Sequence, residues 1–548
     1  MAEGGQEASV PGGKGIPAAP DKDHGADMEA WATGQRLRAS SKIDFFAGAV
    51  DGRQGHGAVA KESISPGELL LEIPLEACLT PLKLPDAPDF VDEQQKLMLR
   101  LLHEALVLGE RSQWKPYLDT LPRDFPTLPL WYTPAELRLL RGTSVDSLLD
   151  GGHIANERDL EAILAWCVAH PELFPPELHL GLDELRWAAS VVASRAFDSS
   201  RAGVVLAPFA DALNHSGAGP HTRMRDGGEL LVFVSERKIA PGEEVLNTYG
   251  EHGNSQWLLN GGFIDVGNPF EELLVSRAEV ISAALTYLST SSSLGDSDAE
   301  RGDADEAEDD ADDTSVEGHV SSRLGWMQQQ RVAADDSFAI TSDDLLPDGM
   351  VTLLLVLCMS GSEFAAYQRR PSDQRLIDLA AEDLGEPLLR DLYGAVLRLV
   401  ELVEQRFEAS LEEDLRLLEA LFPSALGSSA RAAQAAAAPA TGGCEEPPLP
   451  APAASLGPMP PPAAKRRRCS SQGAAAPDAA ALAAAVASTF GPQVRPENAR
   501  NALLLRVAQK RLLRELRQRT RECFEADGEG SEASESESAE AEEPAARN

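Results

Sequence analysis

The chain has 548 residues, which is enough for more than one domain with its own core. Its formal net charge is −39, and a nucleic-acid-binding protein would more often carry a basic domain, so we expect no nucleic-acid partner. Much of the acid lies in two runs, residues 296–313 and 525–543, which are typical of solvated disorder.

The six cysteines are scattered without a close pair. This spacing excludes a CxxC zinc cluster and offers no disulfide framework, so a reducing compartment is expected. The longest apolar run, residues 350–359, is too short to span a bilayer. The first thirty residues contain no apolar stretch that would indicate a secretory signal. We expect a soluble intracellular monomer with no membrane and no metal partner.

The N-terminal half predicts a small β-fold that is interrupted by helices. Residues 1–35 form a Gly-, Ala- and Pro-rich arm that we predict to be disordered. Residues 36–268 follow as one domain, with a helical insert at about 85–193. Two similar segments, ISPGELLL from Ile64 and IAPGEEVL from Ile239, each predict a Pro-Gly turn between strands. Within the insert, apolar spacing predicts helices over 93–108, 133–140, 156–170 and 183–196.

The C-terminal half is predicted to be an all-α domain, residues 269–424, with an acidic disordered loop at about 290–322. Its predicted helices cover 269–289, 326–332, 350–360, 372–383, 387–407 and 411–421. Residues 425–495 are an Ala/Pro-rich low-complexity insert. Residues 496–523 predict the helix that closes this domain, because a free helix would expose too many leucines. Residues 524–548 predict an acidic disordered tail.

A cluster of polar residues interrupts the apolar pattern at Asp211, Asn214 and His215. A strand at 230–234, a Pro-Gly turn and a second strand at 245–249 follow, and the last of these ends in Tyr249 and Gly250. Polar side chains beside glycines, which let a ligand approach the backbone, predict a site here. Asp211 and His215 could also be metal ligands, but no third ligand lies at a useful spacing.

Four segments of the chain, in this order, resemble the motifs of SET-domain methyltransferases: GRQGHGAVAKESISPGELLLEIP, SRAF, PFADALNHS and GEEVLNTYGEHGNSQWLLNGGF. The helical insert with its WKPYL segment and the leucine-rich C-terminus narrow the resemblance to the class typified by the Rubisco large-subunit lysine methyltransferase. The resemblance covers roughly residues 40–270 by motif and 271–523 by pattern. It implies an α+β fold, in which a SET β-fold of small sheets with a pseudoknot precedes a helical substrate-binding domain.

The resemblance also implies an activity, S-adenosylmethionine-dependent methylation of a protein lysine. Tyr249 would be the catalytic residue. The residues implied in binding S-adenosylmethionine are Gly55, Gly57, Glu72, Ile73, Pro74, Asn214, His215, Tyr249 and Phe263. Arg195, Phe197 and Asp211 would shape the substrate channel, and no metal is implied.

Several features leave alternatives open. Gly261 stands where the family often has a side chain, and the turn at 221–228 has no aromatic residue, which would widen the channel. A catalytically weak SET-fold adaptor and a protein-histidine methyltransferase are therefore the alternatives. The lack of Cys-rich segments favours a non-histone protein substrate. The cluster Lys465–Arg468 predicts a nuclear import signal, with the cytoplasm as the alternative compartment.

Overall fold

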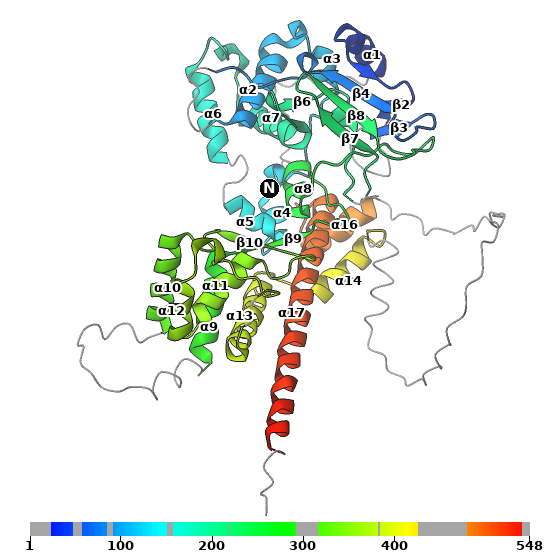
Figure 1. Cartoon of the computed structure of the whole chain (residues 1–548). Coiled ribbons are helices and arrows are strands. Elements are labelled where there is room, and N and C mark those ends of the chain that lie inside the picture. Colours follow the sequence, from blue (N-terminus) through cyan, green and yellow to red (C-terminus); the bar gives the residue numbers. More distant parts are fainter. Residues whose placement is uncertain are drawn as a thin grey trace, which may run out of the picture.

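The computed structural model describes residues 24–47, 57–84, 91–150, 157–217, 219–291, 316–381, 384–425 and 479–539. The chain forms an N-terminal lobe, residues 24–261, and a C-terminal lobe, residues 272–421, with α17 (Pro496–Ala539) running from the region between them along the second (Figure 1). Each lobe has its own apolar core. A third cluster, which we call the joint core, lies between them. It is built from residues 132–148, 258–264, 411–425 and 486–507.

The N-terminal lobe contains one four-stranded sheet and two smaller ones. The larger sheet has the order β1-β4-β8-β7, with all neighbours antiparallel. Its strands are β1 (Arg38–Ala39), β4 (Leu69–Pro74), β7 (Thr222–Asp226) and β8 (Leu230–Ser235). The smaller sheets pair β2 (Ile43–Ala47) with β3 (Gly57–Ala60), and β5 (Ala196–Ser199) with β6 (Gly203–Leu206). Buried and more exposed residues alternate along β8, as a strand with one face on a core requires.

The two similar turn segments lie side by side. Ile64 and Ile239 exchange both backbone hydrogen bonds, at 3.0 and 3.1 Å. Gly67 and Gly242 both have φ of +80°, so each turn needs glycine at that position. The strand predicted over 245–249 is wrong, because the backbone N–H of Val245 bonds to Ala58 whereas that of Asn247 bonds to Asn214. A segment that changes partner every second residue forms isolated bridges instead of a strand.

Helices fill most of the region of the predicted insert. Its helices are α2 (Glu93–Leu102), a π-helical turn (His103–Leu108), α3 (Lys115–Thr120), α4 (Pro134–Leu139), α5 (Ser144–Asp150), α6 (Glu157–Ala169) and α7 (Leu182–Arg195). Short 3-10 turns occupy Leu75–Ala77, Gly109–Arg111, Pro129–Trp131, Pro176–Leu178 and Ala210–Ala212. Thr133 caps α4, and Glu136 returns a hydrogen bond to it, which is the capping box that its Thr-Pro start predicts.

The predicted disordered arm does not extend to residue 35. Helix α1 (His24–Gly34) packs against α3, and its Met28 is completely buried. The indole N–H of Trp31 donates to the carbonyl of Gln113 at 2.7 Å. Two apolar side chains among small and polar neighbours are therefore enough to dock this segment.

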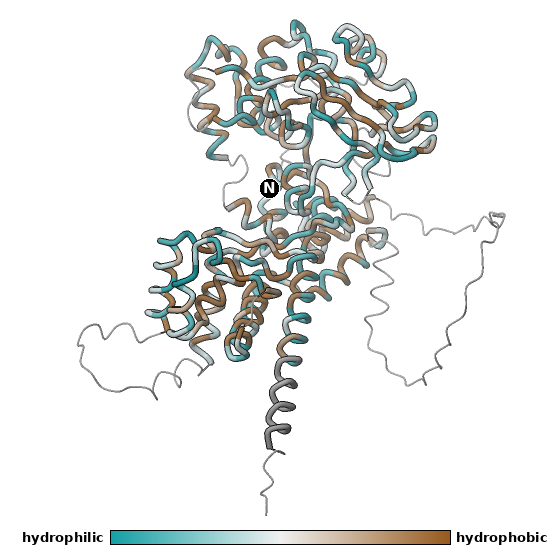
Figure 2. The backbone as a smooth tube through the Cα atoms, in the orientation of Figure 1, coloured by the Kyte–Doolittle hydropathy of each residue, from teal (hydrophilic) through white to brown (hydrophobic). Residues whose placement is uncertain are grey.

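The C-terminal lobe is helical, as predicted, with one small sheet in addition. Its elements are β9 (Glu272–Ser276), α9 (Arg277–Thr290), α10 (Val316–Gln330), β10 (Ser337–Thr341), α11 (Asp348–Cys358), α12 (Gly361–Gln368), α13 (Glu386–Glu404) and α14 (Leu411–Leu421). The helix predicted from residue 269 begins only at Arg277, because residues 272–276 pair with β10. Figure 2 shows apolar segments in α9, α11 and α13 and hydrophilic ones on the outer helices. Helix α11 is buried on every side.

The helix predicted over 372–383 is wrong, since only a 3-10 turn at Ser372–Gln374 forms there. Ile377, which follows, donates its backbone N–H to the hydroxyl of Thr352 in α11, so an extended segment crosses that helix. Two further corrections concern the C-terminus. Helix α16 (Ala479–Phe490) forms inside the predicted low-complexity insert, and α17 continues to Ala539, past the predicted end at 523. Alanine, which favours helix, makes up most of α16, and alanine and glutamate recur in the extension of α17 after residue 523, where Pro544 is the next proline.

Some predictions fall outside the described residues, among them Gly55, Lys465–Arg468 and most of the acidic loop. Nuclear import through Lys465–Arg468 stays a prediction. Across the described part of the chain, no helix is both long enough and apolar enough to cross a membrane.

A buried ionic cluster fastens α17 to α14. The fully buried carboxylate of Asp414 accepts hydrogen bonds from Arg506 at 2.6 and 3.0 Å and from Lys510 at 2.6 Å. Removing the charge of Asp414 would leave two buried cations without their shared partner.

We predict that Asp414→Asn lowers the free energy of unfolding by about 3 kcal/mol, because a buried charge without its partner is strongly destabilising. Chemical denaturation of the full chain measures this. Glu412→Gln is the control, since Glu412 pairs with Arg514 on the same two helices at an exposed position and should cost less than about 1 kcal/mol. Equal losses of unfolding free energy in the two variants would show that the buried cluster at Asp414 does not fasten α17 to α14.

A titratable carboxyl lies where α8 (Asn254–Gly261) meets β9. Glu271 accepts a hydrogen bond from the amide of Asn254 at 2.6 Å and another from the backbone of Glu272 at 3.2 Å. Burial raises the pKa of Glu271 to about 7, against an ordinary value of 4.5. A raised pKa means that the folded state favours the protonated carboxyl, so the stability from this group is full below pH 4.5 and is lost as pH rises through about 7.

We predict that Glu271→Gln is more stable than the wild type at pH 8 by about 1–2 kcal/mol, and nearly equal to it at pH 5. The difference arises because the wild type must ionise a half-buried carboxyl between these pH values and the amide does not. Thermal unfolding of both proteins across pH 5–8 measures this. A constant difference between them over that range would show that Glu271 does not titrate there.

Candidate active site

A cavity of about 590 Å³ opens in the N-terminal lobe between the end of α7, β5, β7 and α8. Its lining includes Arg195, Phe197, Asp211, Met224, Asn247, Tyr249, Trp257, Asn260 and Phe263. Five residues that the sequence assigns to a site thus meet at one cavity, although they are far apart in the chain: Arg195, Phe197, Asp211, Tyr249 and Phe263. The junction of α7 with β5 at residue 196 places the first two beside each other on its wall.

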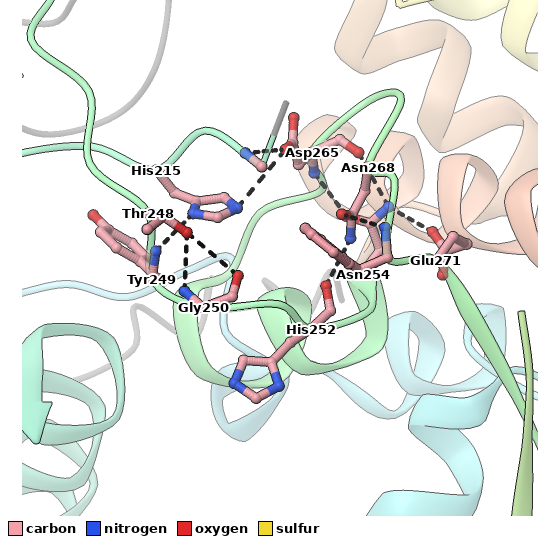
Figure 3. Close-up of polar contacts among 11 residues, drawn as sticks. His215, Thr248, Tyr249, Gly250, His252, Asn254, Asp265, Asn268 and Glu271 are labelled. Carbon is pink, nitrogen blue, oxygen red and sulfur yellow. Dashed lines mark hydrogen bonds and ion pairs between the residues drawn. The ribbon is translucent and has the colours of Figure 1, made fainter. Parts of the chain in front are cut away.

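Tyr249 is fixed at the cavity wall by two hydrogen bonds to the segment that the sequence singled out. Its backbone N–H donates to Nδ1 of His215 at 3.0 Å (Figure 3). Its hydroxyl donates to the backbone carbonyl of Leu213 at 2.9 Å. Gly250 follows with φ of +122°, a conformation that favours glycine. The phenol oxygen, the Leu213 carbonyl and the chain direction after Tyr249 are therefore all set by local geometry.

His215 is buried at the centre of three aromatic rings. Its ring centroid lies 5.1 Å from that of Tyr249, 4.5 Å from that of Trp257 and 5.9 Å from that of Phe263. Because Nδ1 accepts a hydrogen bond from Tyr249, the ring is held in the tautomer that carries its hydrogen on Nε2. Nε2 lies 3.8 Å from Oδ2 of Asp265, which also accepts from the backbone of Gly217 at 3.0 Å.

Asn214 contacts the segment that leads to Tyr249 through both its backbone and its side chain. Its carbonyl accepts from the N–H of Asn247 at 2.8 Å, and its amide donates to Glu244 at 2.7 Å. Neither Asn214 nor His215 is part of the cavity lining. Both residues instead hold the segment that carries Tyr249.

Asp211 is part of a buried trio that sequence reasoning only partly found. The hydroxyl of Tyr117, in α3, donates to Oδ2 of Asp211 at 3.0 Å, and Arg195 lies 3.3 Å from the same oxygen. Burial raises the pKa of Asp211, and the neighbouring Arg195 opposes that shift. Burial, with Asp211 nearby, also raises the pKa of Tyr117 well above its ordinary range. The sequence analysis does not assign Tyr117 to the site, because its partner lies 94 positions away in the sequence.

The other residues implied in cofactor binding lie apart from the cavity. Gly57 begins β3, and residues 72–74 end β4. Ile73 is completely buried in the core of the lobe, and Glu72 lies 3.5 Å from Arg38 at the sheet edge. None of these residues lines the cavity. Gly55 is outside the described residues.

Two departures from the family pattern have structural counterparts. A side chain at Gly261 would place its Cβ 2.5 Å from the ring of Phe263, so glycine here gives the ring its room. In place of an aromatic residue, β7 contributes Met224 to the wall. Trp257, which the sequence analysis left unassigned, lies beside Phe263 with its ring plane only 8° from parallel.

The aromatic rings at the cavity fit a cofactor that carries a cationic sulfonium. Aromatic faces attract cations, and three aromatic rings lie around His215. Two of them, Trp257 and Phe263, also offer apolar faces to a flat heterocycle. In the described ranges no group of three or more His, Cys, Asp or Glu side chains is placed to hold a metal ion.

Comparison with known proteins shows the family of the chain. The SET domain family matches residues 55–250. The chain is 30% identical to the Salmo salar N-lysine methyltransferase setd6 over 62% of its own length and 75% of that protein. It is 26% identical to the Rattus norvegicus N-lysine methyltransferase SETD6 over 72% of itself and 84% of that relative. The ribosomal lysine N-methyltransferase set10 of Schizosaccharomyces pombe is 28% identical over 40% of this chain and 42% of its own.

A solved structure of Rubisco LSMT bound to AdoMet shares the fold. It matches with a TM-score of 0.56 and 16% identity, over 92% of this chain and 93% of its own. This chain belongs to the SET-domain N-lysine methyltransferases, enzymes that transfer a methyl group from S-adenosylmethionine to a protein lysine.

Proposed function

We propose that this chain methylates a lysine of a non-histone protein and that Tyr249 aligns the lysine amine in the cavity. The observation that carries the proposal is the pairing of the Tyr249 hydroxyl with the Leu213 carbonyl at the cavity wall. A relative named as a ribosomal lysine methyltransferase supports a substrate other than a histone. The lack of Cys-rich segments in the sequence also favours a non-histone substrate.

The hydroxyl of Tyr249 acts as an aligner in this proposal. Its hydrogen is given to Leu213, and a phenol oxygen that donates its hydrogen can still accept from an amine N–H. The Leu213 carbonyl orients that hydroxyl by accepting its hydrogen. Together they would direct the nitrogen lone pair along the line of transfer, and such alignment supplies a large part of the rate enhancement in displacements.

The walls of the cavity favour the reactive form of the substrate. A lysine amine has a pKa of about 10.4 in water, and an apolar channel favours its neutral, nucleophilic form. Phe197 and Met224 supply apolar wall, while Arg195 and Tyr117 hold the carboxyl of Asp211 at the same wall. When bound, S-adenosylmethionine supplies a methyl group on a sulfonium that leaves as a neutral thioether. Phe263 and Trp257 would hold that cofactor through their ring faces.

We predict that Tyr249→Phe lowers kcat for methyl transfer about 100-fold, the usual loss when one oriented polar group is removed from a transition state. S-adenosylmethionine should still raise the melting temperature of this variant, because the ring stays in place. Transfer of labelled methyl groups to protein extracts, followed by kinetics on the labelled substrate, measures the rate.

Tyr132→Phe is the matched control. The hydroxyl of Tyr132 is buried outside the cavity without a hydrogen-bond partner among the described residues, so its loss should leave kcat unchanged. A Tyr249→Phe enzyme as fast as the Tyr132→Phe enzyme would refute the role of Tyr249. Label found mainly on histones would refute the substrate class.

A further inference from the structure

One buried face of α17 carries polar side chains, although a buried helix face is usually apolar. Asn498, Asn501, Leu505 and Gln509 are three or four residues apart, so they share one side of the helix. All four are buried, and three of them carry amides. A buried amide is costly unless it is hydrogen-bonded, so the partners of these side chains show what this face is for.

Asn501 holds the backbone next to Phe263. Its amide donates to the carbonyl of Gly262 at 3.1 Å, across 239 positions of sequence. Gly262 has φ of +71° and ends α8, and a Cβ there would lie 2.4 Å from the hydroxyl of Thr127. The peptide that leads into Phe263 is thus enclosed between Thr127 on one side and Asn501 on the other.

The side-chain amide of Asn498, one turn earlier in α17, contacts the helical insert close to Thr127. It donates to the carbonyl of Pro126 at 3.0 Å and to Glu136 at 2.9 Å. Glu136 also accepts hydrogen bonds from the guanidinium of Arg495, the residue just before α17 begins. The hydrogen bonds to Glu136, led by those from Arg495, outweigh its burial and lower the pKa of Glu136 to about 2.

Gln509 holds the other end of α8. Its amide nitrogen lies 2.9 Å from the hydroxyl of Ser255 in the first turn of α8 and 3.0 Å from that of Ser144. The same nitrogen lies 3.0 Å from the carbonyl of Glu272, and its oxygen accepts from the backbone of Ser144 at 3.0 Å. Helix α8 is therefore fixed at its start by Gln509 and at its end by Asn501.

Helix α8 and the residues after it form one wall of the cavity. Gln256, Trp257, Asn260 and Gly261 lie in α8, and Phe263 follows two residues beyond Gly261. Neither Asn501 nor Gln509 lines the cavity. We propose that Asn501 and Gln509 are positioning residues for methyl transfer, through which α17 holds Trp257 and Phe263 in the geometry that binds S-adenosylmethionine.

This inference rests on the proposed role of Phe263 in cofactor binding, and it differs from a general stabilising role of α17. Another side of the helix carries Arg506 and Lys510, whose partner Asp414 belongs to α14 and does not line the cavity. Loss of that contact loosens α17 without removing either amide contact to the wall. The two sides of the helix can therefore be separated by mutation.

The test measures binding of S-adenosylmethionine to the full chain by calorimetry, together with the cofactor KM. We expect Asn501→Ala to bind the cofactor about fivefold more weakly, the value of one typical buried hydrogen bond. Asp414→Asn, although less stable, should bind it as the wild type does. Equal cofactor affinity in Asn501→Ala and the wild type would overturn the inference, as would an equal loss in Asp414→Asn.

A double-mutant cycle identifies the route of the effect. In a Phe263→Ala background the Asn501→Ala change should weaken cofactor binding less than in the wild type, because one of the two rings that α17 positions is gone. An undiminished effect in that background would overturn the inference while leaving the proposed function intact. Wild-type affinity in Phe263→Ala alone would instead refute the role of Phe263 and the inference with it. If Asn501→Ala does not fold, Ser255→Ala, which removes the Gln509 contact from the side of α8, takes its place in the same cycle.

Discussion

Residues 213–216 cross residues 247–249, and the hydrogen bonds at this crossing hold the site together. Backbone bonds link Asn247 to Asn214 and Ser216, at 2.8 and 2.9 Å. The ring of His215 and the carbonyl of Leu213 then bind the backbone and hydroxyl of Tyr249. Because backbone atoms make most of these contacts, the position of Tyr249 follows from the path of the chain. The cavity, the aromatic rings and the buried Asp211 are all arranged around that fixed point.

The crossing fixes one wall of the cavity, and the far end of the chain fixes another. Helix α17 enters the joint core between the lobes, where its amides contact both ends of α8. The resemblance implies that the helical lobe binds the substrate protein. Its helix α17 would also hold part of the cavity wall in place. A change in the amide contacts that α17 makes to α8 would reach Trp257 and Phe263 through that helix, although neither amide lines the cavity.

The sequence was sufficient where local chemistry decides the structure. The paired Pro-Gly turns, the Thr-Pro start of α4 and the Tyr-Gly end of the motif each fix backbone geometry by themselves, and each was located correctly. Partners brought together by folding were not predictable. Tyr117 meets Asp211 across 94 positions, and Gln509 meets Ser255 across 254. For α17 the leucines predicted a buried helix, but no local signal distinguishes a buried glutamine from an exposed one.

We propose that Tyr249, Trp257 and Phe263, the three rings around His215, form the pocket for S-adenosylmethionine. Thermal unfolding of the full chain with and without S-adenosylmethionine tests it most directly, because a ligand that binds only the folded state raises the melting temperature. His215→Ala would remove the centre of the ring cluster, and His170→Ala, beside α6 and away from the cavity, is the control. The account predicts a cofactor-dependent rise in the wild type and in His170→Ala that is lost in His215→Ala. No rise in the wild type, or an undiminished rise in His215→Ala, would contradict it.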